Sequence, residues 1–224
     1  MTSSPAVAVP QLDGLKELEC FESWNIVLTH ESSDSNLNNV TFNSATFAQL
    51  RNGFGLPSIG EYFMGAQPFF HLINNGDYIV RVDMWLQDGT FHFAEFKGAV
   101  VYPATFNYAL SLQSYYKGSA TAGGMVRHHS SSVLAATDND AGLALNCLDD
   151  FGGGWWYING RTVMTQNGEE QLCFVTHLTS QDAMVWAQED SDGTIVGSFD
   201  LSKAVVRMMG DPEFTQCNSG PSLV

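Results

Sequence analysis

The sequence predicts an α+β domain in which an antiparallel β-sheet forms a regular half beside an irregular one. Three segments, residues 78–85, 90–96 and 106–112, alternate apolar and polar side chains with the period of two that is typical of half-buried strands. Asp88-Gly89, between the first two segments, is a dipeptide that favours tight hairpin turns. Together these segments predict an antiparallel meander of three consecutive strands.

Shorter patterns flank this meander. Residues 24–29 (WNIVLT) have the β-branched and apolar composition of a strand. Residues 46–52 (TFAQLRN) predict a short helix that ends at Gly53, because glycine readily forms a left-handed C-cap. Further strand patterns occur at 170–176, 183–187 and 198–207. Residues 118–150 are rich in Gly, Ala, Ser and Asp with little periodicity, which indicates a functional or metal-organised loop region.

The domain organisation follows from the absence of repeats and of long linkers in the sequence. We expect one domain over residues 15–210, a flexible arm at 1–14 and a tail at 211–224. A chain of this length buries about 70% or more of the surface that it exposes when unfolded, so a sizeable core can form.

The charge balance excludes several classes of function. Nine Lys and Arg residues stand against 24 Asp and Glu residues, a formal net charge of −15. Nucleic-acid binders need basic residues for the phosphates, and anionic lipid attracts basic segments, so neither partner is expected. No apolar run approaches the roughly 18 residues of a membrane span. The first ten residues lack the regions of a signal peptide, so the chain either is intracellular or begins after a signal.

Signatures of common enzymes are incomplete in this sequence. His30-Glu31 begins like a zinc-protease helix, but Asp34 stands where the second histidine is needed. Residues 53–55 (GFG) lack the third glycine of a dinucleotide-binding fingerprint, and no G-x-S-x-G elbow occurs. The sequence therefore predicts a protein that is not an enzyme.

The four cysteines are Cys20, Cys147, Cys173 and Cys217. None of them forms a C-x-x-C pair, which argues against a zinc ribbon or a thioredoxin-like site. An even number fits two disulfides in any of three connectivities, and four buried free thiols are the alternative.

Two clusters carry candidate binding chemistry. Asp138 and Asp140 lie two residues apart in a loop, so both carboxylates can turn toward one Ca²⁺ ion, with an expected dissociation constant of about 10⁻⁴–10⁻³ M. A solvated Asx turn explains the same residues equally well. Residues 152–157 (GGGWWY) combine a permissive backbone with large aromatic surfaces. This second cluster is either core or the wall of a sugar pocket.

A series of short motifs follows the order found in a known family. Residues 138–140 (DND), 146–147 (NC) and 153–157 (GGWWY) match its D-x-D calcium loop, its Asn-Cys pair and its G-x-W-W-Y run. Further matches are 53–55 (GFG), 60–65 (GEYFMG), 71–72 (HL), 77–83 (DYIVRVD), 115–124, 184–186 (MVW) and 199–208. This ordered set, from Cys20 to Met208, resembles the fibrinogen-related (fibrinogen C-terminal) domains.

The resemblance implies a secreted recognition module with a central twisted antiparallel sheet, short helices, and a loop-rich calcium and ligand subdomain at about 118–195. Many members of this family are lectins for acetylated sugars in innate immunity, while others bind protein partners or serve clotting and assembly. We therefore expect an extracellular carbohydrate-binding domain that binds a glycan or glycoprotein with the help of a weak Ca²⁺ site. The alternative is a structural or protein-interaction domain that has lost the sugar pocket. Such a domain can form a homo-oligomer.

The resemblance also assigns roles to residues. It implies that Asp138 and Asp140, with the carbonyls of Gly142 and Leu143, bind calcium, although the loop to Cys147 is one residue longer than usual. The ligand contacts that it implies are aromatic surfaces of Phe151, Trp156 and Tyr157 and polar groups of His128 and His129.

The sequence departs from the family pattern after Tyr157. The family continues with a segment that bears Cys-His and supplies much of the acetyl-binding site, whereas here Tyr157 runs directly into residues 158–160 (ING). An aromatic residue expected shortly before Ser198 is replaced by residues 195–197 (IVG). Since the missing cysteine is the usual partner of the one at position 147, our hypothesis is the pairing Cys147–Cys173 and Cys20–Cys217.

Overall fold

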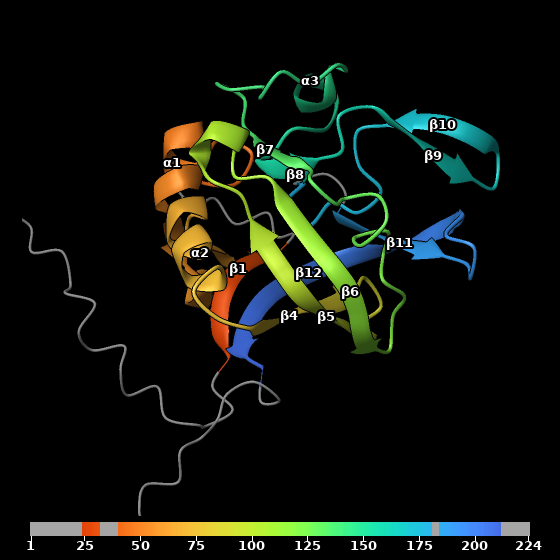
Figure 1. Ribbon diagram of the computed structural model, residues 1–224, viewed down its shortest axis with the longest axis horizontal. Coiled ribbons are helices and arrows are strands. Elements are labelled where there is room, and N and C mark those ends of the chain that lie inside the picture. Colours follow the sequence, from red (N-terminus) through yellow and green to blue (C-terminus); the bar gives the residue numbers. More distant parts are fainter. Residues whose placement is uncertain (1–23, 32–39, 181–183, 212–224) are drawn as a thin grey trace, which may run out of the picture.

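The computed structural model describes residues 24–31, 40–180 and 184–211, in which ten strands form one continuous sheet (Figure 1). The main path of the sheet runs through β2 (Phe54–Leu56), β3 (Glu61–Phe63), β1 (Asn25–Glu31), β12 (Ile195–Gly210), β4 (Tyr78–Leu86), β5 (Phe91–Val101) and β6 (Leu110–Gly118). Three strands extend it: β11 (Met184–Glu189), β9 (Arg161–Thr165) and β10 (Gly168–Leu172). A two-stranded sheet of β7 (Val133–Ala135) and β8 (Trp155–Tyr157) stands apart.

Strand β12 is the longest strand and joins the parts of the sheet. Its C-terminal half lies between β1 and β4, so that Arg207 stands opposite both Ile26 and Arg81. Its N-terminal half pairs with β11, where Trp186 stands opposite Phe199. The strands predicted at 183–187 and 198–207 are these two elements, and β12 is longer than predicted at both ends.

The predicted meander is present as β4, β5 and β6, and its first hairpin matches the prediction. The Asp88 carboxylate accepts a hydrogen bond from the Thr90 N–H at 2.8 Å, which closes the turn. The third strand begins later than predicted, at Leu110. Asn107 and Tyr108 have φ values of 48° and 47°, and this left-handed backbone ends the short 3₁₀ turn η3 (Ala104–Phe106) instead of extending a strand.

Helix α1 (Phe47–Asn52) is the short helix that the sequence predicts. Thr46 caps its N-terminus in a capping box with Gln49. Gly53 ends the helix with φ 94° and ψ 158°, which is not the left-handed C-cap that was expected. A Cβ atom at this position would lie 2.6 Å from the Met64 carbonyl oxygen, so glycine is needed for the close approach of two chain segments. The 3₁₀ turn η2 (Pro57–Ile59) follows β2.

Helix α2 (Ala66–Ile73) was not predicted. Its buried residues, Ala66, Phe69 and Ile73, have helical spacing, and Pro68 lies in its first turn. This pattern was available in the sequence. Within the described part of the chain, no helix is long and apolar enough to cross a membrane.

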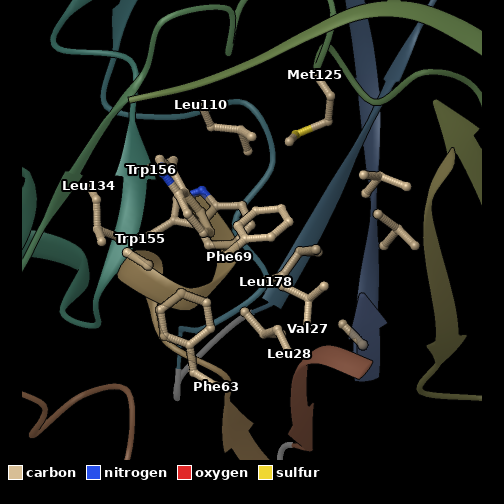
Figure 2. Packing of buried hydrophobic residues seen from close by; sticks show 14 of the residues in the cluster. Val27, Leu28, Phe63, Phe69, Leu110, Met125, Leu134, Trp155, Trp156 and Leu178 are labelled. Carbon is tan, nitrogen blue, oxygen red and sulfur yellow. The ribbon is translucent and has the colours of Figure 1, made fainter. Parts of the chain in front are cut away.

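The main hydrophobic core joins the sheet to the irregular half of the protein. Figure 2 shows Trp156 of β8 close to Phe69 of α2, with Phe63 of β3 nearby. The Trp156 ring centroid lies 5.9 Å from that of Phe63 and 6.4 Å from that of Phe69, and both contacts are edge-to-face. Aromatic packing on Trp156 therefore fixes the short sheet β7–β8 against the rest of the fold.

The irregular half contains few regular elements, as its composition predicts. Between residue 118 and β9 the described chain contains β7, β8 and the five-residue helix α3 (Cys147–Phe151). The hairpin β9–β10 continues the sheet from β12 and projects beyond the main path of strands (Figure 1). The strand predicted at 170–176 is β10, which ends at Leu172.

Candidate functional site

The aromatic run of β8 belongs to the core. Trp155 is 2% exposed, Trp156 4% and Tyr157 0%. The indole nitrogens donate inward, from Trp155 to the Thr176 carbonyl at 2.8 Å and from Trp156 to the Tyr108 carbonyl at 2.9 Å. Neither Trp156 nor Tyr157 presents a ring face to solvent, which departs from the expectation that they line a sugar pocket.

Tyr157 holds the glycine-rich turn that precedes it. Its hydroxyl donates to the carbonyls of Gly152 and Gly153, which are 2.7 and 2.9 Å away. Burial raises the pKa of the phenol above its ordinary value of 10.0, so the ring stays neutral. The contacts of Tyr157 are thus those of a structural residue.

His129 is also part of the interior. Its Nδ1 lies 3.1 Å from the Trp156 carbonyl, and its Nε2 accepts hydrogen bonds from the N–H groups of Val175 and Thr176 at 3.3 and 3.2 Å. Burial lowers the pKa of His129 to about 3, so the ring is neutral near pH 7. With both nitrogens facing backbone groups, His129 links β8 to the segment after β10 and is not placed to contact a ligand.

A second buried histidine, His177, was not singled out from the sequence. Its Nε2 lies 3.1 Å from the Tyr157 hydroxyl, while its Nδ1 is buried without a hydrogen-bond partner. Burial lowers the pKa of His177 to about 3 as well. Its ring contacts Phe174 and Trp155. A single sequence contains no signal that separates this histidine from an exposed one.

Two of the five predicted ligand contacts reach the surface. Phe151, at the end of α3, is 44% exposed and meets Phe174 edge-on at 4.8 Å. His128 is half-buried, with its Nε2 3.2 Å from the Gly193 carbonyl. Phe151 is therefore the aromatic residue of the predicted pocket that remains available to a ligand.

The acidic loop forms a turn closed by its own hydrogen bonds. The Asp140 carboxylate accepts from the Gly142 N–H at 2.9 Å, and the Asp140 carbonyl accepts from the Leu143 N–H at 3.0 Å. The Asp138 carboxylate accepts from the Phe47 N–H at 2.6 Å, so it also caps the first turn of α1.

These residues do not make up a calcium cage by themselves. Ca²⁺ takes about six to eight oxygen ligands, whereas one oxygen of Asp138 and one of Asp140 are engaged by backbone N–H groups. Among the residues that the structure describes, no three or more Asp, Glu, His or Cys side chains gather as a metal site. Calcium binding by Asp138 and Asp140, with the carbonyls of Gly142 and Leu143, stays a prediction.

The predicted disulfide between Cys147 and Cys173 is present. The S–S distance is 2.11 Å and the two Cα atoms are 5.5 Å apart. The bridge connects the first residue of α3 to the segment just after β10. Ile158 N–H donates to the Cys173 carbonyl at 2.8 Å, so the chain passes directly from β8 toward β9 where the family has its Cys-His segment. Cys20 and Cys217 lie outside the described residues.

A group of charges on the sheet face opposite the main core was not recognised from the sequence. We call this surface, formed by β12, β4, β5 and β6, the outer face. At its centre the Arg81 guanidinium lies 2.6 Å from the Asp83 carboxylate and 2.9 Å from that of Glu95. Arg207 reaches the other Asp83 oxygen at 2.8 Å. Alternation along β4 places Arg81 and Asp83 on one face. The alternation does not give the order of strands in the sheet, which brings Glu95 and Arg207 next to these two residues.

The comparisons with known proteins agree with this fold. Residues 22–209 match the family described as fibrinogen beta and gamma chains, C-terminal globular domain. Human angiopoietin-related protein 6 is 28% identical over 193 residues, which cover 82% of this chain and 36% of that protein. The human fibrinogen alpha chain is 30% identical over 145 residues, which cover 59% of this chain and 16% of that one. The chain thus spans about a third of the first of these relatives and about a sixth of the second.

Solved structures show the same fold. The fibrinogen-like globe domain of human ANGPTL2 has a TM-score of 0.64 at 24% identity and covers 84% of this chain and 81% of that one. The corresponding domain of human ANGPTL6 has a TM-score of 0.61 at 22% identity, with 84% and 78% covered. The chain is therefore a divergent member of the family of fibrinogen C-terminal globular domains.

Proposed function

We propose that this domain is an extracellular module that binds a protein partner. Its membership of the fibrinogen C-terminal family supports a recognition role. The Cys147–Cys173 disulfide supports an extracellular location, because structural disulfides persist in oxidising compartments and are rare in the cytosol. The proposal includes no catalytic step.

The observation that carries the proposal is the burial of the aromatic residues that would form a sugar pocket. Sugar recognition by stacking needs exposed ring faces, whereas Trp156 and Tyr157 are at most 4% exposed and direct their polar atoms inward. The Cys-His segment that supplies much of the family's acetyl-binding site has no counterpart after Tyr157. A protein partner does not require such a pocket, because protein interfaces are broad and shallow patches of about 800 Å² per partner.

Glycan binding is a second candidate function, and the exposed ring of Phe151 favours it. Its edge-to-face contact with Phe174, at 4.8 Å between ring centroids, supports a fixed orientation of the ring. The calcium ion that the family resemblance implies would be bound near Asp138 and Asp140, and its role would be to hold the acidic loop in place. A glycan that stacks on the Phe151 ring would then bind in a calcium-dependent manner.

One experiment separates the two functions. The purified domain, labelled with biotin, is applied in parallel to a glycan array and to an array of extracellular protein domains, each with calcium and with a chelator. We expect saturable binding to a protein that survives the chelator, and no glycan signal. Glycan binding that disappears with the chelator, in the absence of any protein signal, would contradict the proposal and favour the second candidate.

The Phe151→Ala variant is the matched control for this experiment. Phe151 is exposed and lies at the end of a short helix, so its truncation should leave the fold intact. Binding to a protein elsewhere on the surface should be unaffected by this change, whereas stacking on a sugar should be lost. Phe106→Ala, at a residue that is 61% exposed in the loop between β5 and β6, controls for the loss of an exposed ring.

A further inference from the structure

The outer face gathers most of the basic residues of a strongly acidic chain. Five of the nine Lys and Arg residues make their ion pairs on this face: Arg81, Lys97, Lys117, Lys203 and Arg207. Among the described residues their ion-pair partners are four carboxylates, those of Glu31, Asp83, Glu95 and Asp211. Elsewhere in the described part of the chain, 13 acidic residues stand against three basic ones.

Three of the five positive groups are well exposed, and most of the negative groups are not. The side chains of Asp83, Glu95 and Asp211 are 2–4% exposed. Lys117 is 58% exposed, and Lys203 and Arg207 are 35% exposed. Among the four carboxylates, only that of Glu31, at 45%, is comparably exposed. A partner that approaches the outer face therefore meets cationic groups, although the face is nearly neutral in sum.

Aromatic side chains stand among these cations. The Arg81 guanidinium lies 4.1 Å from the ring centroid of Phe93, and Phe93 stacks on Phe91, which is 43% exposed. The Tyr116 ring, also 43% exposed, has the Lys97 ammonium 4.2 Å and the Lys117 ammonium 5.3 Å from its centroid. Aromatic rings and arginine are the side chains that dominate binding energy in protein interfaces.

A β-bulge explains why Tyr116 lies on this face. The register of β6 against β5 shifts between Glu95 and Phe96: Lys117 stands opposite Glu95 and Tyr115 opposite Phe96, so Tyr116 is the extra residue. Such a bulge turns a side chain and interrupts strand pairing at a sheet edge. Tyr116 is thus presented on the outer face, beside the ammonium groups of Lys97 and Lys117.

We propose that the outer face is a docking surface for an acidic segment of a protein partner, a chain rich in Asp and Glu with interspersed aromatic or apolar residues. Its carboxylates would meet the exposed ends of Lys117, Lys203 and Arg207, and its apolar side chains would cover Phe91 and Tyr116. The surface that the structure describes outside this face repels the same segment, because 13 of its 16 Asp, Glu, Lys and Arg side chains are acidic. This inference rests on the proposed protein-binding function and assigns that function a surface and a partner chemistry.

The test uses a fluorescein-labelled synthetic peptide of repeated Asp-Tyr-Glu and a control peptide in which Asn and Gln replace the acids. Fluorescence anisotropy measures the binding of each peptide to the full chain. We expect the acidic peptide to bind, with an affinity that falls as salt is added, because exposed charges are screened. The neutral peptide should bind at least about tenfold more weakly, since several exposed ion pairs are lost together.

Variants locate the binding surface. Lys117→Gln should weaken acidic-peptide binding about fivefold, as expected for one exposed ion pair. Tyr116→Ala and Phe91→Ala should each weaken it about tenfold or more, as truncated aromatic contacts at an interface do. Arg51→Gln removes one positive charge on α1, and Phe106→Ala removes one exposed ring outside the face, so both should change binding less than about twofold. Thermal melting checks that each variant folds. Lys117 is the most exposed of the five basic residues, so Lys117→Gln is the substitution least able to disturb the fold.

Two results would overturn the proposal. One is equal binding of the acidic and neutral peptides, and the other is binding that is unchanged in Lys117→Gln, Tyr116→Ala and Phe91→Ala. The absence of any peptide binding at millimolar concentration would also reject this surface. If a protein captured on the array still binds these three variants normally, the outer face is not its binding surface, while the proposed protein-binding function stands. If the array shows no protein partner at all, the function itself fails.

Discussion

At the scale of single residues, the interior of the protein contains two histidines that are held neutral. His129 and His177 are buried, and burial lowers the pKa of each to about 3 from the ordinary 6.5. In the unfolded chain both rings take up protons near pH 6.5, whereas in the folded protein they do so only near pH 3. Between these values the unfolded state binds more protons, so the free energy of unfolding decreases as the pH falls.

The substitution His177→Phe tests this pH dependence. His177 is surrounded by the rings of Trp155, Tyr157 and Phe174, and its Nδ1 has no hydrogen-bond partner, so Phe should fit without a large loss near pH 7. We expect the free energy of unfolding to fall less steeply below pH 6.5, by about 1.4 kcal/mol per pH unit for the one proton removed. Urea unfolding between pH 7 and pH 5 measures the slope.

The same substitution at the exposed His71 serves as the control for replacing a histidine by phenylalanine. A slope that is identical in His177→Phe and in the unmodified protein would mean that His177 titrates normally in the folded state.

Asp138 allows the helix-capping and calcium roles to be separated. Its carboxylate accepts the Phe47 N–H at the start of α1, and Asn keeps an acceptor oxygen whereas Ala does not. In the presence of a chelator, Asp138→Ala should lower the free energy of unfolding by about 1 kcal/mol, and Asp138→Asn by clearly less. Melting curves with and without added calcium complete the comparison.

Calcium binding would appear as a rise in the melting temperature of the unmodified protein that is lost in Asp138→Asn, because an ion bound only by the folded state stabilises that state. If calcium changes none of the melting temperatures, Asp138 is a helix cap without a metal. If the Ala and Asn variants melt at the same temperature in the chelator, the capping interpretation is wrong.

The burial of individual aromatic residues could not be predicted from the sequence. Residues 152–157 (GGGWWY) were compatible with core and with a pocket wall, because an uninterrupted aromatic run has no polar face to mark its exposed side. The contacts that decide the matter, from Trp156 to Tyr108 and from Trp155 to Thr176, join residues that are 48 and 21 positions apart. Phe151 differs from them because it ends a helix and projects outward.

At the scale of elements, the disulfide stabilises the region where the family pattern is shortened. Cys147 begins α3 and Cys173 follows β10, at a sequence separation of 26 residues. The enclosed loop includes all of β8, β9 and β10. The bridge therefore closes the irregular half around the shortened connection that leads from β8 into β9.

Replacing both cysteines with alanine should lower the free energy of unfolding by about 2–4 kcal/mol, the usual effect of freeing a loop of this length in the unfolded chain. Melting with and without a reductant gives an independent measure of the stabilisation that the disulfide contributes. The paired change Cys147→Ala and Cys173→Ala should make the melting of this region insensitive to the reductant. Alkylation of both native thiols without prior reduction would show that the bridge does not form.

Strands with a polar and an apolar face were predicted well, and elements outside that pattern were not. In β4 the alternation of Arg81 and Asp83 with Val80 and Val82 identified the strand and its two faces. The segment at 106–109 also alternates, yet Asn107 and Tyr108 adopt positive φ because the chain turns there to reach β6. Alternation over so few residues does not distinguish a strand from a tight turn.

At the scale of the whole molecule, the family resemblance established the fold and the arrangement of charge distinguishes this member. The protein keeps the sheet, the Trp-Trp-Tyr strand and a disulfide at Cys147, while the segment that normally follows the strand is missing. Its net charge of −15 is unevenly distributed, with five of its nine basic residues on the outer face. Sequence composition gives the total charge but not this segregation, which depends on the order of strands in the sheet.

The most direct measurement is an NMR titration of the isotopically labelled domain with N-acetylglucosamine and, separately, with the acidic peptide. We expect the peptide to shift the backbone amide signals around Phe91, Phe93 and Tyr116, and the sugar to leave the indole signals of Trp155 and Trp156 unchanged. Shifts of those indole signals with the sugar, and none on β5 and β6 with the peptide, would contradict this expectation.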